Sequence, residues 1–247
     1  MDNDDIDIEK HHWNRIDISH NVYNPNNIII DKENYYTIPF GHRCTSALAL
    51  RVAGLRKFSL PFDWVKPIYP NKIKNILENN FEGFIPDINS MDNNVLSNKY
   101  NINFHHFNKN IDEGVKEYGR RIERFNKVMN ENKKLYFVYV NEDYMYDEKH
   151  RDNKFNEDIF SQMVELESYL KKKYSNLNYA ILYFNFIEHE IPKDSNIINI
   201  VLHTSNISNV ANWKNFQPLR KYVGNVLCNI FEKKGEWLEF TEEMYNK

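Results

Sequence analysis

Short, continuous apolar runs recur along this chain and limit its fold more than any other feature. Residues 135–140, 180–186 and 197–202 are runs of six or seven mostly apolar side chains, each bounded by polar residues. Runs of this length are typical of strands that are buried on both faces of a sheet. Residues 35–40 predict a similar strand, and the alternating residues 100–104 predict a half-buried one.

Helical periodicity separates these predicted strands. Apolar residues recur every three or four positions over 111–130 and again over 155–173, so each segment predicts an amphipathic helix. Further helices are predicted at 45–53, 70–79 and 213–231. Alternating strands and helices predict an α/β fold, or the related α+β class, with one mixed β-sheet flanked by helices.

Length and composition favour a single domain. The chain has 247 residues, of which 41% are hydrophobic and 15% aromatic, which is enough for a sizeable core. Residues 1–22 are acidic and then rich in His and Asn, so we predict a flexible polar arm there and one domain over 23–247. A net charge of -3 gives no general attraction to nucleic acid.

Several absences narrow the class of protein further. The N-terminus lacks the basic start and apolar run of a signal peptide, and no stretch approaches ~18 consecutive apolar residues. Cys44 and Cys228 are far apart and form neither a CxxC pair nor a zinc spacing. The chain also lacks GxGxxG and P-loop motifs. We therefore expect a cytoplasmic protein with no membrane span, no bound metal and no cofactor.

Cys44 lies where a predicted strand gives way to a predicted helix. The run 35–40 ends at Gly41, and the helix 45–53 follows the cysteine directly. Amide donors and the positive helix end favour a thiolate there, which lowers a thiol pKa from its free value of about 8.5. Cys44 is thus a candidate nucleophile. The alternative is that Cys44 is a small buried side chain that packs at the junction between the strand and the helix.

A nucleophilic cysteine needs an imidazole partner from elsewhere in the chain. His105 and His106 follow the predicted strand 100–104, and strand alternation turns their rings to opposite sides. At most one of them can therefore face Cys44. His203, at the end of the run 197–202, is a rival partner.

Three further groups are candidates for a site. Asp63 lies between Phe62 and Trp64, where its carboxylate either caps a turn or orients a polar group. Residues 141–143 are polar and directly follow a buried strand, where α/β sheets often place site residues. On the helix 111–130, Arg120, Arg121 and Arg124 either clamp a carboxylate or phosphate or form a solvated flank with an Arg120–Glu123 pair.

Five motifs resemble, in order, those of a family of predicted papain-like cysteine peptidases. The first is Gly-His-Arg-Cys at 41–44, followed by Leu-Arg and Gly-Leu-Arg within 50–56 and by Ser-Leu-Pro-Phe-Asp-Trp at 59–64. Phe-His-His-Phe at 104–107 and the Arg-Arg-Ile-Glu-Arg-Phe block within 118–125 resemble later motifs of the family. The resemblance covers roughly residues 35–140.

The resemblance implies a catalytic pair and a class of reaction. Cys44 matches the nucleophile and His106 the catalytic histidine, although Phe107 stands where the family usually has an acidic residue. Asp63 matches the Pro-Phe-Asp-Trp motif, and Asn141 is the alternative third residue. The implied function is a cysteine hydrolase or acyl transferase that acts on a peptide or another carbonyl-bearing substrate.

Two other functions stay open at this point. One is a non-catalytic module, or an enzyme acting on glycans or nucleotide sugars, that binds an anionic ligand through the arginine cluster. The other is an inactive relative that kept the scaffold for a partner surface.

Overall fold

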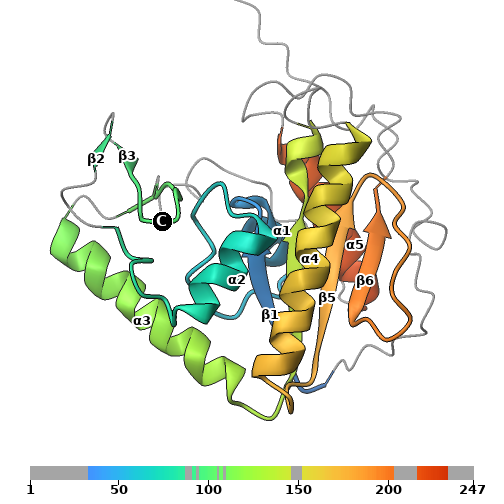
Figure 1. The fold of residues 1–247 in the computed structure, drawn as a ribbon, viewed down its shortest axis with the longest axis horizontal. Coiled ribbons are helices and arrows are strands. Elements are labelled where there is room, and N and C mark those ends of the chain that lie inside the picture. The colour runs from blue at the N-terminus through green and yellow to red at the C-terminus, as the bar shows by residue number, and fades with distance from the viewer. Residues whose placement is uncertain are drawn as a thin grey trace, which may run out of the picture.

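Four parallel strands form the centre of the computed structural model (Figure 1). They are β1 (Tyr35–Gly41), β4 (Lys134–Val140), β5 (Tyr179–Asn185) and β6 (Ile197–Val201), in the order β1-β4-β5-β6. Each neighbouring pair is parallel, so all four carboxyl ends lie at one edge of the sheet. The structure describes residues 33–86, 91–92, 95–104, 106–107, 110–145, 152–202 and 216–232.

Helices cover both faces of this sheet (Figure 1). Helices α2 and α4 pack together on one face, and α1 and α5 pack together on the other. The long helix α3 adds to the first of these layers. The helices span Thr45–Val52 (α1), Pro70–Glu78 (α2), Ile111–Met129 (α3), Asn153–Lys173 (α4) and Phe216–Ile230 (α5), with a 3-10 turn at Glu142–Met145 and a two-stranded ribbon of β2 (Met91–Asp92) and β3 (Val95–Leu96).

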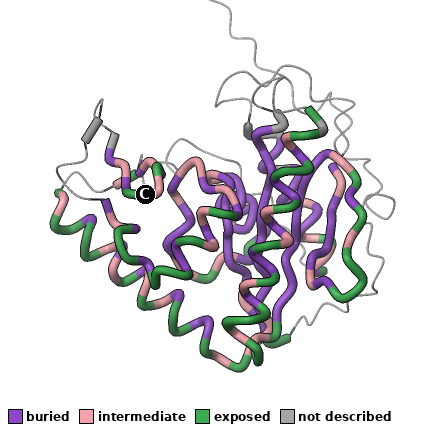
Figure 2. Tube along the Cα trace, in the orientation of Figure 1, coloured by how far each residue is buried: buried purple, intermediate pink, exposed green. Residues whose placement is uncertain are grey.

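Alternate residues of each strand enter the two opposite cores. Phe137 and Tyr139 pack with α2, α3 and α4, whereas Tyr136 and Val138 pack with α1 and α5. All four side chains are fully buried, and Figure 2 shows the sheet as the most continuous buried part of the chain. Burial on both faces explains why the strands appear in the sequence as unbroken apolar runs.

The predicted α/β class is confirmed, and one predicted strand is wrong. Residues 100–104 lie outside the main sheet and form only isolated bridges, in which Asn103 pairs with Lys66 and Ser97. Asn101 has a positive φ of 53°, which interrupts the extended conformation that a strand requires. The main sheet is therefore parallel throughout and not mixed. The predicted arm 1–22 lies outside the described residues.

A helix that crosses a bilayer must be both long and apolar. No helix in the described part of the chain is both long enough and apolar enough to span one.

Candidate functional site

The loops after β1 and β4 meet at the carboxyl edge of the sheet. The turn at the end of β1 depends on Gly41, whose φ is 107° and whose position leaves no space for a Cβ, which would lie 2.3 Å from Ile68 Cγ2. The backbone N–H of His42 donates to the Val140 carbonyl at 3.3 Å, and its carbonyl accepts from Ile68 N–H at 2.9 Å. These bonds hold the segment 42–44 against the end of β4.

Cys44 occupies the position that the sequence predicts, between β1 and α1. It is the N-cap residue of α1, its thiol is free, and its side chain is partly exposed. The Cys44 carbonyl accepts the first helical hydrogen bond from Leu48 N–H at 2.9 Å. The sulfur therefore lies at the positive end of the helix dipole.

A fully buried carboxylate, Asp143, contacts polar side chains of the Cys44 loop and of Tyr69. Its Oδ1 lies 3.0 Å from both His42 Nε2 and Arg43 Nη2, and its Oδ2 accepts from the Tyr69 hydroxyl at 2.8 Å. Burial alone would raise the pKa of Asp143. The pKa is nevertheless well below its ordinary value, because Asp143 contacts His42, lies near the charge of Arg43 and accepts the Tyr69 hydrogen bond.

A second buried carboxylate, Glu142, lies on the Cys44 side of this network. The Thr45 hydroxyl donates to Glu142 Oε2, and Arg220 Nε donates to the Thr45 oxygen at 3.5 Å. Glu142 Oε1 is buried without a hydrogen-bond partner, with Arg43 Nε 3.7 Å away. The site therefore contains a buried negative charge next to the candidate nucleophile.

This environment raises the pKa of the Cys44 thiol instead of lowering it. Burial and the Glu142 carboxylate raise it to about 11, while Arg220, Lys66 and Arg43 oppose the shift. The thiolate that the helix position predicts is therefore not the resting form at neutral pH. The helix dipole is outweighed because the sulfur is poorly solvated and close to a negative charge.

Alkylation kinetics test this thiol pKa directly. In a Cys228→Ser protein, whose only thiol is Cys44, we expect slow iodoacetamide alkylation at pH 7. The rate should rise about tenfold per pH unit, because it follows the thiolate fraction, and level off near the pKa of about 11. Glu142→Gln should lower the pKa and speed alkylation at pH 8. A plateau below pH 8.5 in the parent protein would show that the thiol is activated.

His106 is exposed and follows the segment that pairs with Lys66. Its ring lies edge-on to Trp64, with 5.7 Å between the ring centroids. Loss of solvation around the ring and the charges of Lys66, Arg121 and Arg220 lower the pKa of His106, which favours a neutral ring at pH 7. Within the described residues no hydrogen bond joins this ring to Cys44. His105 and His203 lie outside the described residues.

The charges of the same two cations nevertheless act on both Cys44 and His106. Lys66 and Arg220 each lower the pKa of both residues. The backbone connects them too, since Lys66 exchanges two hydrogen bonds with Asn103, of 2.7 and 3.1 Å, while Ile68 N–H bonds to the His42 carbonyl. The short segment 66–68 thus joins the Cys44 loop to the chain that leads to His106.

Asp63 is fully buried and pairs with Arg56. Its Oδ2 accepts from Arg56 Nε at 3.1 Å and also from Nη2, whereas Oδ1 has no hydrogen-bond partner. Burial raises the pKa of Asp63 even though Arg56 opposes this. The Arg56 guanidinium lies 5.3 Å from the centroid of Trp64, which in turn contacts His106. Asp63 is therefore connected to the His106 ring only through Arg56 and Trp64.

The other predicted site residues are more dispersed. Asn141 is buried and donates to Asn156 of α4 at 3.0 Å. Arg120 is exposed, Arg121 is buried and pairs with Glu117, and Arg124 donates to the Ser59 carbonyl. The three arginines therefore have three different environments, and the described ion pairs do not include an Arg120–Glu123 pair.

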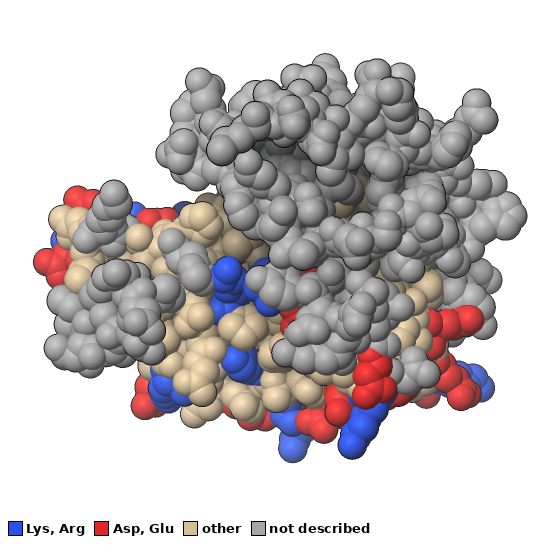
Figure 3. All heavy atoms as spheres, turned by 90° about the horizontal axis from the view of Figure 1, so that it is seen from above, with Lys and Arg blue, Asp and Glu red and all other residues tan. Residues whose placement is uncertain are grey.

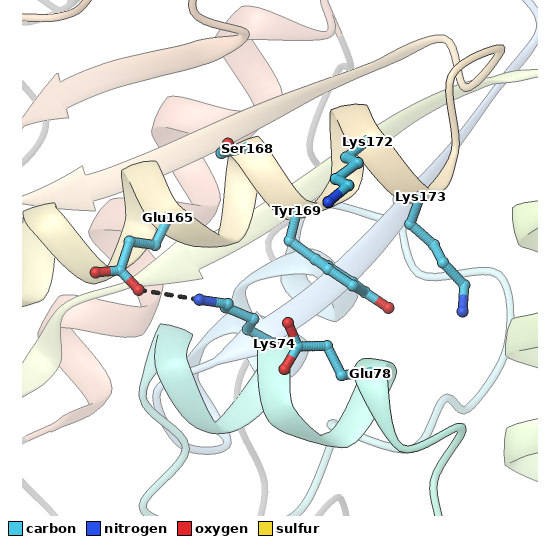
Figure 4. Close-up of a pocket in the computed structure, with 7 residues that line it drawn as sticks. All are labelled: Lys74, Glu78, Glu165, Ser168, Tyr169, Lys172 and Lys173. Carbon is cyan, nitrogen blue, oxygen red and sulfur yellow. Dashed lines mark hydrogen bonds and ion pairs between the residues drawn. The ribbon is translucent and has the colours of Figure 1, made fainter.

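Two surface hollows lie away from this site. The larger, of about 580 Å³, is a groove between α2 and α4, in which Lys74 and Glu165 form a 3.1 Å ion pair (Figure 4). The smaller, of about 360 Å³, is formed by residues 129–133 and 173–178, which precede β4 and β5. Both lie toward the amino ends of the strands, whereas Cys44 lies at the carboxyl edge. Among the described residues no cluster of three or more His, Cys, Asp or Glu side chains could hold a metal ion.

Sequence reasoning missed several residues of this site. His42 lies inside the Gly-His-Arg-Cys motif, so its proximity to Cys44 was a usable signal. Tyr69, Lys66 and Arg220 come from segments without a chemical motif, and only the folded chain brings them to the loop.

Comparison with known proteins agrees with the motifs. Residues 36–189, more than half of the chain, match the model of the family described as "putative papain-like cysteine peptidase". No curated protein and no solved structure matches the chain. The matched region contains all of β1 except Tyr35, and also the Cys44 loop, the segment 66–68, His106 and the residues after β4. The chain therefore belongs to this family.

Proposed function

We propose that this protein is a cysteine hydrolase or acyl transferase in which Cys44 is the nucleophile and His106 transfers the proton. One observation, besides family membership, supports a joint role for Cys44 and His106. The charges of Lys66 and Arg220 act on both the partly exposed sulfur at the start of α1 and the His106 ring. The segment 66–68 connects the two sides of this site.

The pKa directions favour a neutral thiol–imidazole pair over a resting ion pair. A thiol with a raised pKa keeps its proton at pH 7, and an imidazole with a lowered pKa is free to accept it. As a substrate carbonyl binds, Cys44 Sγ attacks its carbon and the thiol proton passes to His106. His106 then protonates the leaving group, and a water that it deprotonates hydrolyses the acyl-cysteine.

Two further groups support this reaction. Backbone N–H groups at the start of α1 would stabilise the oxyanion that forms on the carbonyl oxygen. Asp63 is a positioning residue in this proposal, because Arg56 and Trp64 connect it to the ring of His106. We further propose a peptide or another acyl compound as substrate and action in the cytoplasm, which suits the two free cysteines.

Acetylation by p-nitrophenyl acetate tests the proposed function. In the Cys228→Ser protein we expect one acetyl group on Cys44, detected by intact mass spectrometry, and a burst of p-nitrophenol followed by slower turnover. His106→Ala should slow acetylation by about 100-fold, which is typical for loss of a general base. Cys44→Ser, which retains Cys228, measures the background of a thiol outside the site.

Either of two results would reject this mechanism. One is equal acetylation of Cys44 and Cys228, and the other is an unchanged rate in His106→Ala. They would favour a non-catalytic protein with a structural cysteine, the alternative that the raised pKa of Cys44 supports.

A further inference from the structure

A buried arginine of helix α5 contacts the start of helix α1. Arg220 is 8% exposed, and its Nε donates to the Thr45 hydroxyl oxygen at 3.5 Å. Thr45 is the first residue of α1 and directly follows Cys44, the N-cap residue of that helix. The family model matches residues 36–189 and therefore does not include α5. The contact thus comes from a part of the chain that family membership does not describe.

Close packing between α1 and α5 determines where this arginine lies. Gly224 of α5 is buried, and an added Cβ would lie 3.0 Å from Val52 Cγ1 and 3.5 Å from the Ala49 carbonyl oxygen. The glycine therefore allows the two helices to approach closely at this point. Arg220 precedes Gly224 by four residues, so both lie on the face of α5 that is turned toward α1. The packing thus brings the arginine to Thr45.

The Thr45 hydroxyl connects Arg220 to the buried Glu142 carboxylate. It accepts a hydrogen bond from Arg220 and donates one to Glu142 Oε2. A hydroxyl group can do both at once, and hydrogen bonds in such a chain polarise and strengthen one another. A buried carboxylate is strongly destabilising unless donors and cations compensate its charge. Arg220 is therefore placed to hold Thr45 and to compensate Glu142.

A second cation, Arg43, is shared between two carboxylates. Its Nη2 lies 3.0 Å from Asp143 Oδ1, whereas its Nε lies 3.7 Å from Glu142 Oε1. Both carboxylates are buried, and Figure 3, which views the carboxyl edge of the sheet, shows basic side chains gathered near the middle of this face. One positive charge balances only one of two negative charges, so Glu142 depends on a further cation. Arg220 supplies that charge through Thr45.

We propose that Arg220 is a positioning residue of the Cys44 site, whose bond to Thr45 fixes the first turn of α1 and the Glu142 carboxylate. That the site is catalytic rests on the proposed function, whereas the effect of Arg220 on the reactivity of Cys44 does not. Without Arg220, the charge of Glu142 would be less compensated near Cys44. The thiolate would then form less readily, because a nearby negative charge raises a thiol pKa.

Alkylation of Cys44 over a range of pH tests this role. In the Cys228→Ser protein, we expect Arg220→Met to lower the iodoacetamide rate at pH 9 about tenfold, the effect of raising the thiol pKa by one unit. A variant that only loosened the fold would expose the sulfur and bring its pKa toward the free value of about 8.5. Alkylation would then become faster, so the sign of the change separates positioning from a purely structural role.

A double-mutant cycle shows whether Thr45 transmits the effect. Thr45→Val removes the hydroxyl and should slow alkylation to a similar extent, and the double variant Arg220→Met/Thr45→Val should be no slower than either single variant. Arg220→Lys keeps the charge but lacks the Nε donor, so it should also be slow, and it replaces Arg220→Met if that variant does not fold. Arg120→Met, the same substitution at an exposed position of α3, is the matched control and should be alkylated like the parent.

The outcomes separate this inference from the proposed function. Additive losses in the double variant, parent-like alkylation of Arg220→Lys, or faster alkylation of Arg220→Met would overturn the positioning role. If the variants behave as expected but p-nitrophenyl acetate does not acetylate Cys44, the hydrolase proposal fails and the role of Arg220 stands. If Cys44 is acetylated and Arg220→Met is alkylated like the parent, only the role of Arg220 fails.

Discussion

Replacing Arg56 with methionine is expected to lower the free energy of unfolding by about 3–5 kcal/mol. Asp63 is fully buried, and Arg56 is the residue that binds its Oδ2. Its Oδ1 has no hydrogen-bond partner, so removal of the guanidinium would leave the carboxylate unpaired in the core. Arg56 also donates to Ser59 Oγ at 2.8 Å and lies over Trp64. Urea unfolding at pH 7 measures the loss.

The size of this effect depends on burial and not on the ion pair alone. In the Lys74–Glu165 pair the glutamate side chain is 62% exposed, so Lys74→Met should cost less than about 1 kcal/mol. A buried carboxyl group without its cation favours the protonated form. The loss of unfolding free energy caused by Arg56→Met should therefore become smaller as the pH falls. Equal losses in the two variants would mean that Arg56 is not needed to neutralise Asp63.

Asp143→Asn is expected to be nearly as destabilising, and its effect should depend on pH. The carboxylate is buried and contacts His42, Arg43 and Tyr69, so its loss should cost about 3 kcal/mol or more at pH 7. Its pKa is lowered from the ordinary 3.8 in the folded protein. The parent is therefore fully stabilised by this group above about pH 4 and loses that contribution as the pH falls further.

Urea midpoints measured from pH 7 to pH 2.5 give the test. The difference in stability between the parent and Asp143→Asn should narrow as the pH falls below about 4, because Asp143 then takes up a proton on unfolding and the parent loses part of what the carboxylate contributes. Glu165→Gln, at a 62% exposed carboxylate, is the matched control and should follow the parent curve. If the urea midpoints of the parent and of Asp143→Asn fall in parallel with pH, another group is responsible for the loss of stability in acid.

Local patterns predicted most of the fold. Four strands and the positions of α1 to α4 follow from apolar runs and helical periodicity, because burial on two faces or on one stripe leaves a regular trace in the sequence. The exception, residues 100–104, has the alternation of a strand. A single residue with positive φ, Asn101, redirects the backbone, and asparagine at one position is too weak a signal to reveal this.

The location of the candidate site could be predicted better than its electrostatics. The Gly-His-Arg-Cys motif puts Cys44 between a strand and a helix, and the structure places it there. The thiol pKa depends on Glu142, which the fold brings to Thr45 from 97 positions away in the chain. No spacing rule links such distant residues. The helix dipole, a local effect, therefore does not determine the thiol pKa on its own.

The segment 66–68 has a mechanical consequence for the candidate site. Lys66, at one end of the segment, forms two backbone hydrogen bonds with Asn103. Ile68, at the other end, donates one to the His42 carbonyl. The Cys44 loop and the chain that leads to His106 are thus attached to the same short segment. A displacement of either one should therefore be transmitted to the other.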